Sequence, residues 1–414
     1  MIKTLKIVFS QKTHDGTTER LLQLALGYFA TYIVTGIAPK YFLNTAPGYP
    51  AMNDVHYMVY STALSSFFCV FLVILWQWYR FQSQERITVL GVTFPKEFLY
   101  IIPSGVCTAV VVPTTTLMYL LPISVMVAMI IMRASVIVVS RIVDSVQIYQ
   151  GILKKKVYWE ENVAVVFALL AVALQLLNFK GATLMVQETG NYASFFSQLF
   201  VFDARNFAFF TNAAAMTILT SYVLAYAVRI YIMNYFKNTR AKGVSYDNKG
   251  YFAVEQISAS ATMLLVTIAV VFFMTPDLAD PRNFVANFQG AFSAPHEQWW
   301  KAAISGVPYG IGAFFSVFLF MFKGRTATFA GLVNRLTSLI AGTICTLLVF
   351  LLMAQKPPKA EDWVGLAIIL IALYFLGKSE KKRACELAKE HEIELENNTE
   401  IACDPANGAA KKQA

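Results

Sequence analysis

Residues 122–144, PISVMVAMIIMRASVIVVSRIVD, form an apolar stretch with Arg133 near its middle. About eleven residues separate Pro122 from Arg133, which is roughly 16 Å at the rise of an α-helix, so a membrane-spanning helix here places the guanidinium near mid-bilayer. An arginine at that depth is costly unless it faces the interior of a helix bundle or a watery cavity. The stretch therefore predicts a membrane protein with a polar interior.

The composition of the whole chain agrees with this prediction. Hydrophobic residues make up 57% of the 414 positions and charged residues only 14%, whereas soluble domains carry about 25% charged residues. The net charge of +9 comes largely from Lys and Arg in short loops between apolar runs. That pattern orients a membrane protein and does not form a nucleic-acid-binding face, so we expect lipids and no nucleic acid as partners.

We predict an all-α fold with ten transmembrane helices. If the N-terminus is cytoplasmic, 23 of the 34 Lys and Arg residues fall in inside segments, seven in outside segments or at the outer ends of spans, and four further inside the spans. Because basic loops stay in the cytoplasm, both termini are predicted to be cytoplasmic. The predicted spans are 21–42, 57–79, 98–118, 121–145, 162–179, 207–234, 251–274, 300–322, 327–352 and 361–377.

Local matches at a nearly constant offset predict an internal repeat. Since each half holds five spans, the halves would have inverted topology, and binding sites of such transporters lie near the midplane between the repeats. The matches are Ser104-Gly105-Val106 with Ser305-Gly306-Val307 (offset 201), Arg133 with Arg335 (202), and Glu161-Asn162 with Glu361-Asp362 (200).

This repeat sets the expected domain organisation. A cytoplasmic N-terminus (1–20) precedes the first five-helix repeat (21–179), an external loop (180–206) and the second repeat (207–377). A cytoplasmic tail (378–414) follows. Its first part is expected to be a solvated helix, and the part from Asn397 onward is expected to be disordered.

With this repeat, three short patterns resemble the drug/metabolite transporter superfamily, which includes EamA-type permeases, nucleotide-sugar transporters and plastid sugar-phosphate translocators. The patterns are LLPIS at 120–124, MRAS at 132–135 and EDWVGL at 361–366. The resemblance implies a central cavity lined by spans 1–4 and 6–9. In sugar-phosphate members, basic side chains on spans 4 and 9 grip the phosphate, and Arg133 and Arg335 occupy those spans. That branch has Lys-Arg on span 9, where this chain has Asn334-Arg335, so the substrate class stays open.

The candidate substrate-binding residues are centred on the two arginines. An arginine offers a planar fork of donors to a carboxylate or phosphate, and it is worth most in a low-dielectric cavity. The alternative is a structural arginine that is satisfied by carbonyl groups or reaches an interface. The set comprises Arg133, Arg335, Asn334, Tyr119, Ser135, Thr337 and Ser338.

Two groups of residues are candidates for gates. Pro308, Gly310 and Gly312 punctuate one span, where they favour either a flexible gate or close helix packing. Arg141 and Asp144 stand three residues apart, a spacing that allows an ion pair at an inner gate, with an interfacial anchor as the alternative.

The remaining charged residues near the spans are expected to be interfacial. Lys40 and Arg229 are interpreted as interface anchors, and Glu255 as an interfacial carboxylate, so no Asp/Glu/His proton relay is predicted. The chain lacks a GxxxxGK[ST] loop, a paired-carboxylate site, and CxxC or CxxH spacing. We therefore expect no enzyme activity, cofactor or metal.

These observations predict a secondary transporter, a permease that moves a small polar, anionic metabolite such as a sugar phosphate or nucleotide sugar by alternating access. The alternatives are an exporter of drugs, amino acids or cationic metabolites, and a membrane-embedded enzyme. A monomer or homodimer is expected. A bacterial inner membrane is favoured, although the final residues KKQA (411–414) match a dilysine signal of ER and Golgi membrane proteins.

Overall fold

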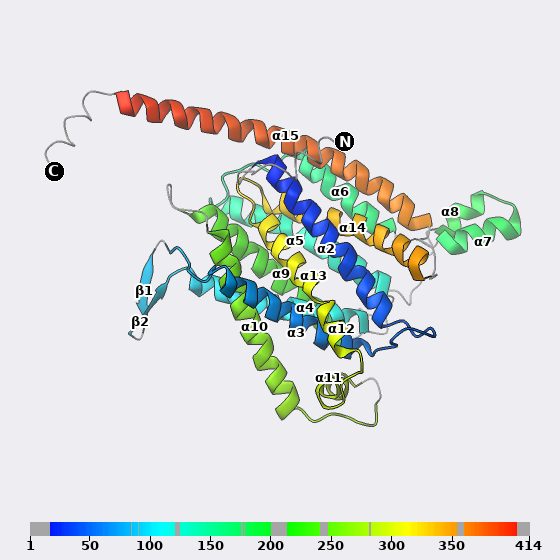
Figure 1. Cartoon of the computed structure of the whole chain (residues 1–414). Helices are drawn as coiled ribbons and strands as arrows, with labels where there is room; N and C mark the ends of the chain where they lie inside the picture. Colours follow the sequence, from blue (N-terminus) through cyan, green and yellow to red (C-terminus); the bar gives the residue numbers. More distant parts are fainter. Residues whose placement is uncertain are drawn as a thin grey trace.

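The computed structural model describes residues 17–83, 85–89, 91–120, 125–174, 177, 179–199, 213–240, 247–280, 283–353 and 360–403. They form a helix bundle with one small β-hairpin (Figure 1). The elements are α2 (Thr18–Phe42), α3 (Asp54–Leu75), β1 (Arg86–Val89), β2 (Val92–Pro95), α4 (Phe98–Leu120), α5 (Val125–Tyr149), α6 (Trp159–Ala173), α7 (Phe179–Thr189), α8 (Ala193–Leu199), α9 (Ala213–Thr239), α10 (Asn248–Phe273), α11 (Phe284–Ser293), α12 (Trp299–Ile304), α13 (Val307–Phe320), α14 (Ala327–Met353) and α15 (Ala360–Cys403).

Eight helical segments in the described part of the chain are long and apolar enough to cross a membrane. They lie in α2, α3, α4, α9, α10, α12 with α13, α14 and α15, at eight of the predicted spans. The protein is therefore an all-α, multi-pass membrane protein. At the other two predicted spans lie α5, which carries Arg133, Arg141 and Asp144, and α6, which has 15 residues. The count of ten spans stays a prediction.

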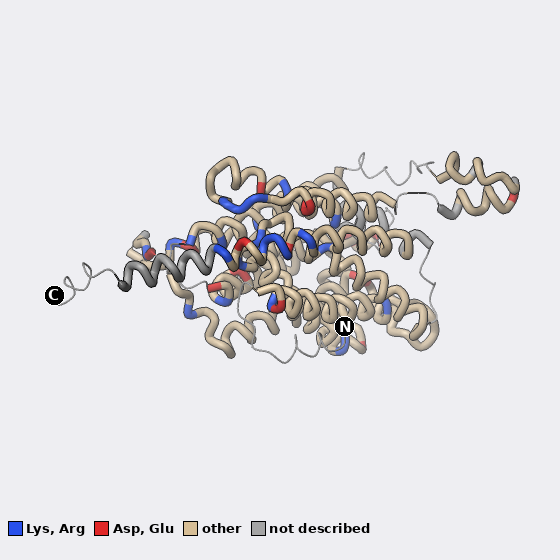
Figure 2. Tube along the Cα trace, turned by 90° about the horizontal axis from the view of Figure 1, so that it is seen from above, with Lys and Arg blue, Asp and Glu red and all other residues tan. Residues whose placement is uncertain are grey.

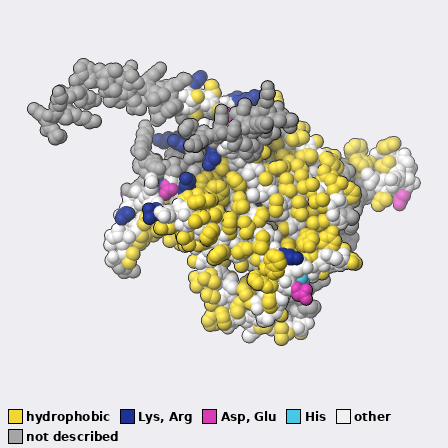
Figure 3. Space-filling model, in the orientation of Figure 1, with side chains coloured by type: hydrophobic (Ala, Val, Ile, Leu, Met, Phe, Trp, Pro, Cys, Tyr) yellow, Lys and Arg dark blue, Asp and Glu magenta, His cyan; other side chains and the backbone are white. Residues whose placement is uncertain are grey.

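The connecting segments separate into two ends of the bundle. The β1–β2 hairpin and the free part of α15 lie at one end, and the helical pair α7–α8 lies at the opposite end (Figure 1). Lys, Arg, Asp and Glu concentrate toward the end from which α15 leaves (Figure 2). The helices between the ends present a broad hydrophobic surface (Figure 3), as expected for a face in contact with lipid.

Three details differ from the sequence prediction. The predicted span 300–322 consists of two helices, because the helix is interrupted at Ser305 and Gly306 before α13 begins. A Cβ atom on Gly306 would collide with the carbonyl oxygen of Ser61 in α3, so the glycine lets the two backbones approach. The external loop contains α7 and α8. The helix α15 continues to Cys403, past the point where disorder was expected.

The inner helices pack against one another in the following pairs. Helix α4 packs against α9 and α10, and α13 packs against α2 and α3. Helix α14 packs against α2 and α5, and α5 also packs against α9. Helices α6 and α15 pack against each other at the side of the bundle. This arrangement surrounds the middle of α14, where the candidate site lies.

Candidate functional site

Arg335 lies on α14 in the interior of the bundle, with 9% of its surface exposed. Its guanidinium carbon is 5.2 Å from the centre of the Tyr226 ring, and the side chain also interacts electrostatically with Tyr222 and Tyr28. The Nε atom of Arg335 is buried and has no hydrogen-bond partner. The guanidinium is thus held among tyrosines with part of its donor capacity unused.

The tyrosines come as two pairs on two helices. Tyr28 and Tyr32 on α2 have ring centres 5.6 Å apart, and Tyr222 and Tyr226 on α9 have ring centres 4.9 Å apart. Each pair has i, i+4 spacing, which places both rings on one face of its helix. We call these four tyrosines together with Arg335 the tyrosine–arginine cluster.

The other buried arginines have carboxylate partners. Arg229 donates from Nε and Nη2 to Glu255 at 2.8 and 3.2 Å, Arg325 pairs with Glu380, and Arg383 lies 3.8 Å from Glu161. Of the four buried arginines in the described part of the chain, Arg335 is the one without a carboxylate within salt-bridge distance. Its positive charge is therefore not neutralised by the residues around it.

An unneutralised guanidinium has a definite chemical consequence. An arginine at the centre of a membrane helix costs about 2.5–3.5 kcal/mol on insertion scales, and an anion that binds it offsets this cost. The planar guanidinium fits carboxylate and phosphate oxygens with paired hydrogen bonds. Tyrosine hydroxyls can donate further hydrogen bonds to the same oxygens. The tyrosine–arginine cluster is therefore suited to hold a small anion.

Arg133, the second predicted arginine, approaches the same helix. It is half-buried on α5, and its Nη2 atom lies 3.6 Å from the position that a Cβ atom on Gly342 would take. Gly342 follows Arg335 by seven residues, so both lie on one face of α14, about 10 Å apart along its axis. The structure thus brings both arginines to the same face of α14, at different depths.

The other predicted substrate-binding residues have mixed surroundings. The Asn334 amide donates to Ser316 on α13 at 3.0 Å, and the Ser338 hydroxyl donates to the carbonyl oxygen of Arg335 at 2.8 Å. These polar groups are used in helix packing and within α14. Ser135 and Thr337 are half-buried, and the side chain of Tyr119 lies outside the described residues.

The proposed flexible gate at Pro308, Gly310 and Gly312 forms the first half of α13. A Cβ atom on Gly310 would lie 3.0 Å from the Ser65 carbonyl oxygen, and one on Gly312 would lie 3.3 Å from Thr31 Oγ1. Both glycines therefore sit where α3 and α2 approach α13 closely, in line with the packing alternative. Movement at this point stays a prediction.

Arg141 and Asp144 do not form the ion pair that their spacing allows. Arg141 donates from Nε to Asn162 Oδ1 at 2.9 Å, while Asp144 accepts from the backbone N–H groups of Ala327 and Thr328 at 2.8 and 2.6 Å. Those N–H groups open α14, where a helix has unpaired donors and a positive dipole end that attracts a carboxylate. Asp144 therefore turns inward to cap another helix.

Arg229 and Glu255 are not interface anchors, in contrast to the sequence interpretation. Both are buried in their bidentate pair, and Glu255 Oε1 also accepts from Ser104 at 2.9 Å and Thr108 at 3.2 Å. Arg229 further interacts with Tyr226, one turn away on α9. Sequence position gave the depth of these residues but not the face of the helix on which they lie.

A dense group of polar contacts closes the end of the bundle from which α15 leaves. Glu161 accepts from Thr326 and Ser379, each at 2.9 Å. Lys237 donates to the Phe320 carbonyl oxygen at 3.1 Å, so both sides of the α13–α14 loop are held. We call the following residues, from α5, α6, α9, the α13–α14 loop and α15, the ionic layer: Asp144, Glu161, Lys237, Arg325, Thr326, Ser379, Glu380 and Arg383.

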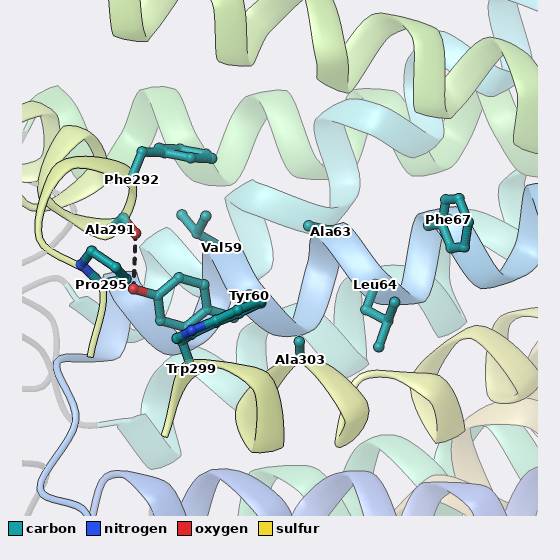
Figure 4. Close-up of a pocket in the computed structure, with 10 residues that line it drawn as sticks. All are labelled: Val59, Tyr60, Ala63, Leu64, Phe67, Ala291, Phe292, Pro295, Trp299 and Ala303. Atoms are coloured by element: carbon teal, nitrogen blue, oxygen red, sulfur yellow. Dashed lines mark hydrogen bonds between the residues drawn. The ribbon is translucent and has the colours of Figure 1, made fainter. Parts of the chain in front are cut away.

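An apolar pocket of about 510 Å³ lies away from this site, between α3, α11 and α12 (Figure 4). The Tyr60 hydroxyl at its edge donates to the Ala291 carbonyl oxygen at 2.9 Å and accepts from the His296 N–H at 3.3 Å, so it is already satisfied. The pocket fits an apolar group and offers no charge to a polar metabolite. Its lining residues are Val59, Tyr60, Ala63, Leu64, Phe67, Ala291, Phe292, Pro295, Trp299 and Ala303.

Sequence reasoning missed Tyr28 and Tyr32 as site residues. A usable signal was present, because they precede Tyr222 and Tyr226 by the same 194 residues.

Among the described residues, no group of three or more His, Cys, Asp or Glu side chains could hold a metal ion. No protein-family model matches the chain, and no curated protein matches it either.

Proposed function

We propose that this protein is a secondary transporter that moves a small anionic metabolite across a membrane by alternating access. The observation that carries the proposal is Arg335, a buried guanidinium held by tyrosines, with an unused Nε donor and with no carboxylate of the described residues in reach. A charge kept in the interior of a membrane protein without a carboxylate partner is best accounted for by a ligand that supplies the opposite charge.

Helix packing supports the inverted repeat on which alternating access depends. If α2–α6 correspond in order to α9, α10, α13, α14 and α15, the larger contacts between the two halves have counterparts: α4 with α9 corresponds to α13 with α2, and α4 with α10 corresponds to α13 with α3. The contact of α5 with α9 likewise corresponds to that of α14 with α2. We propose ten spans in two inverted halves on this basis.

The two Ser-Gly-Val motifs make matching contacts in this scheme. The Tyr251 hydroxyl donates to Ser104 at 2.9 Å, and Tyr57 and Ser305 share a hydrogen bond of 3.2 Å. The glycine of each motif also meets a backbone carbonyl four residues after that tyrosine, Gly105 meeting that of Glu255 and Gly306 that of Ser61. Equivalent contacts in both halves support a repeat of structure as well as of sequence.

The ionic layer suggests how one side of the carrier closes. It ties the α13–α14 loop to α5, α6, α9 and α15 through buried charges. Opening toward that side requires these contacts to separate, so we interpret the structure as a state closed at this end. With both termini in the cytoplasm, as the loop charges predict, the closed end is the cytoplasmic one.

Uptake into proteoliposomes tests the proposal. The screen uses labelled sugar phosphates, nucleotide sugars and dicarboxylates with the wild-type protein, Arg335→Gln and Arg86→Gln. Arg86 is exposed in the β-hairpin and serves as a matched loss of one positive charge. We expect uptake of at least one anion by wild type and Arg86→Gln and none by Arg335→Gln. Equal uptake by Arg335→Gln would contradict the proposed role of Arg335.

A second candidate function is export of apolar or lipophilic cationic compounds. It is favoured by the apolar pocket of Figure 4, whose lining includes four aromatic side chains and no charged group. Binding of tetraphenylphosphonium separates the two functions. Under this alternative, Ala63→Trp, which fills the pocket, abolishes that binding while Arg335→Gln leaves it intact. Under the anion proposal, tetraphenylphosphonium does not compete with the transported anion.

A further inference from the structure

We propose that Arg133, Tyr28 and Tyr32 form a second anion-binding half-site, which replaces the half-site of Arg335, Tyr222 and Tyr226 when the carrier opens to its other side. The inference rests on the proposed transport function and its inverted repeat. It identifies which residues hold the anion in the conformation that the structure does not show.

The residues of the two half-sites correspond one to one along the chain. Tyr28 and Tyr32 precede Tyr222 and Tyr226 by 194 residues, and Arg133 precedes Arg335 by 202 residues. The tyrosines lie on α2 and α9, and the arginines lie on α5 and α14, which are corresponding helices in the proposed repeat. Each half therefore supplies one tyrosine pair and one arginine.

The two arginines nevertheless occupy different positions. Arg335 is 9% exposed, and its guanidinium lies over the ring of Tyr226, which belongs to the same proposed half. Arg133 is half-buried, and its guanidinium lies beside Gly342 of α14, two turns from Arg335. The residue that corresponds to Gly342 at the same offset of 202 is Ser140 on α5. Equivalent residues thus have inequivalent surroundings in this state.

In a transporter built from inverted repeats, such a difference between the halves predicts the structure of the other conformational state. If the two halves adopt different conformations when one side is closed, exchanging those conformations between the halves closes the opposite side instead. After the exchange Arg133 stands over Tyr32 near Tyr28 and Tyr222, and Arg335 extends along α5 toward Ser140. The anion is then passed from one arginine to the other as access alternates.

Paired cysteines test the exchange without any substrate. In a protein whose five native cysteines are replaced by alanine, one variant carries Tyr226→Cys with Arg335→Cys, and the other carries Tyr32→Cys with Arg133→Cys. Each is treated with a short bismaleimide. Both also carry Thr328→Cys as a reporter of the ionic layer. Thr328 is 1% exposed, and its hydroxyl has no hydrogen-bond partner, so this substitution removes no bond of that side chain.

The proposal predicts that both pairs cross-link and that each cross-link traps a different state. The 226/335 cross-link keeps Thr328→Cys protected from a membrane-impermeant maleimide. The 32/133 cross-link makes it react at least about tenfold faster, because an alternative state is commonly populated at only 0.1–10% before trapping. The inference is overturned if 32/133 does not cross-link while 226/335 does, or if both cross-linked proteins leave Thr328→Cys equally protected.

A second measurement uses the native cysteines, in case the cysteine-free protein does not fold. In oriented proteoliposomes, pyrophosphate should change the rate of maleimide labelling of Thr328→Cys, and it should slow the labelling when it is added from one side. Arg335→Gln should abolish the effect of pyrophosphate added from one side of the membrane, and Arg133→Gln should abolish the effect of pyrophosphate added from the other side. Loss of both effects from the same side contradicts the exchange. If cross-linking behaves as expected while no anion has any effect, the exchange stands and the proposed anionic cargo is wrong.

Discussion

The ionic layer and the tyrosine–arginine cluster both hold buried positive charges, but they hold them differently. In the ionic layer, Arg325 pairs with Glu380, and Asp144 caps the first N–H groups of α14. In the cluster, Arg335 has aromatic rings and hydroxyl groups around it, and among the residues that the structure describes no carboxylate lies within salt-bridge distance of it. Both regions lie on or beside α14, one at its first turn and one about two turns further.

The difference distinguishes charges that hold a structure together from a charge kept for a ligand. Removing one member of a buried ion pair leaves its partner uncompensated, so such substitutions are costly. Removing a charge that has no carboxylate partner relieves a cost that was already present. The two regions should therefore respond to neutral substitutions with opposite signs, and each of the following variants tests this contrast.

The largest effect is expected at Glu380. The substitution Glu380→Gln leaves Arg325, which is 2% exposed, without its carboxylate, and a broken buried pair costs about 3–5 kcal/mol. We expect a large fall in the denaturation temperature of the purified protein in detergent. The double variant Arg325→Gln with Glu380→Gln should recover much of the loss. A single variant as stable as wild type would show that the ionic layer is not a stabilising contact.

A smaller loss is expected at Asp144. The substitution Asp144→Asn removes the charge that faces the first N–H groups of α14, an interaction worth about 1–2 kcal/mol in buried geometry. The denaturation temperature should fall by less than in Glu380→Gln. Arg141→Gln is the control, because Arg141 bonds to Asn162 and Ser145 rather than to Asp144. If both variants lost the same amount of stability, the result would support an ion pair between Arg141 and Asp144 instead of the helix cap.

At Arg335 the sign should reverse. Arg335→Met replaces an unneutralised guanidinium with a shorter, flexible apolar chain, so we expect unchanged stability or a gain of about 1 kcal/mol. The measurement is again the denaturation temperature in detergent without added polyvalent anions. A loss as large as that of Glu380→Gln would mean that Arg335 has a structural role.

The smallest effect is expected at Thr328, which lies beside Asp144. Its backbone N–H donates to Asp144, but its hydroxyl is buried without a partner. Thr328→Val keeps the backbone bond and removes the unpaired hydroxyl, so stability should change by less than about 0.5 kcal/mol. A large loss would show that the hydroxyl has a partner in solution.

The membrane-spanning helices could be predicted from the sequence because apolar length is a local property. Eight of the ten predicted spans coincide with helical segments that are long and apolar enough to cross a membrane. The break at Gly306 could not be predicted, since it depends on the approach of α3 from a distant part of the chain. Hydropathy gives the length of a span but not which neighbour crosses it closely.

The candidate site was predicted in part. Arg335 was identified by its predicted depth in an apolar run and by its match to Arg133 in the predicted repeat. The partners of charged residues could not be read from the sequence. Glu255 was placed at the membrane interface, and Asp144 was given an interfacial role or an ion pair with Arg141, because spacing within one helix says nothing about the helix opposite. The Tyr28 and Tyr32 pair could have been found by searching both halves for repeated aromatic residues at one offset.

Anion-dependent stabilisation of the purified protein tests the central claim most directly. At fixed ionic strength, pyrophosphate or a transported anion at 100 times its dissociation constant should stabilise the wild type and Arg86→Gln by about 2.7 kcal/mol. Arg335→Gln should show no such stabilisation, while its denaturation temperature without anion stays at or above that of wild type. Equal stabilisation of Arg335→Gln and wild type by the anion would contradict the account.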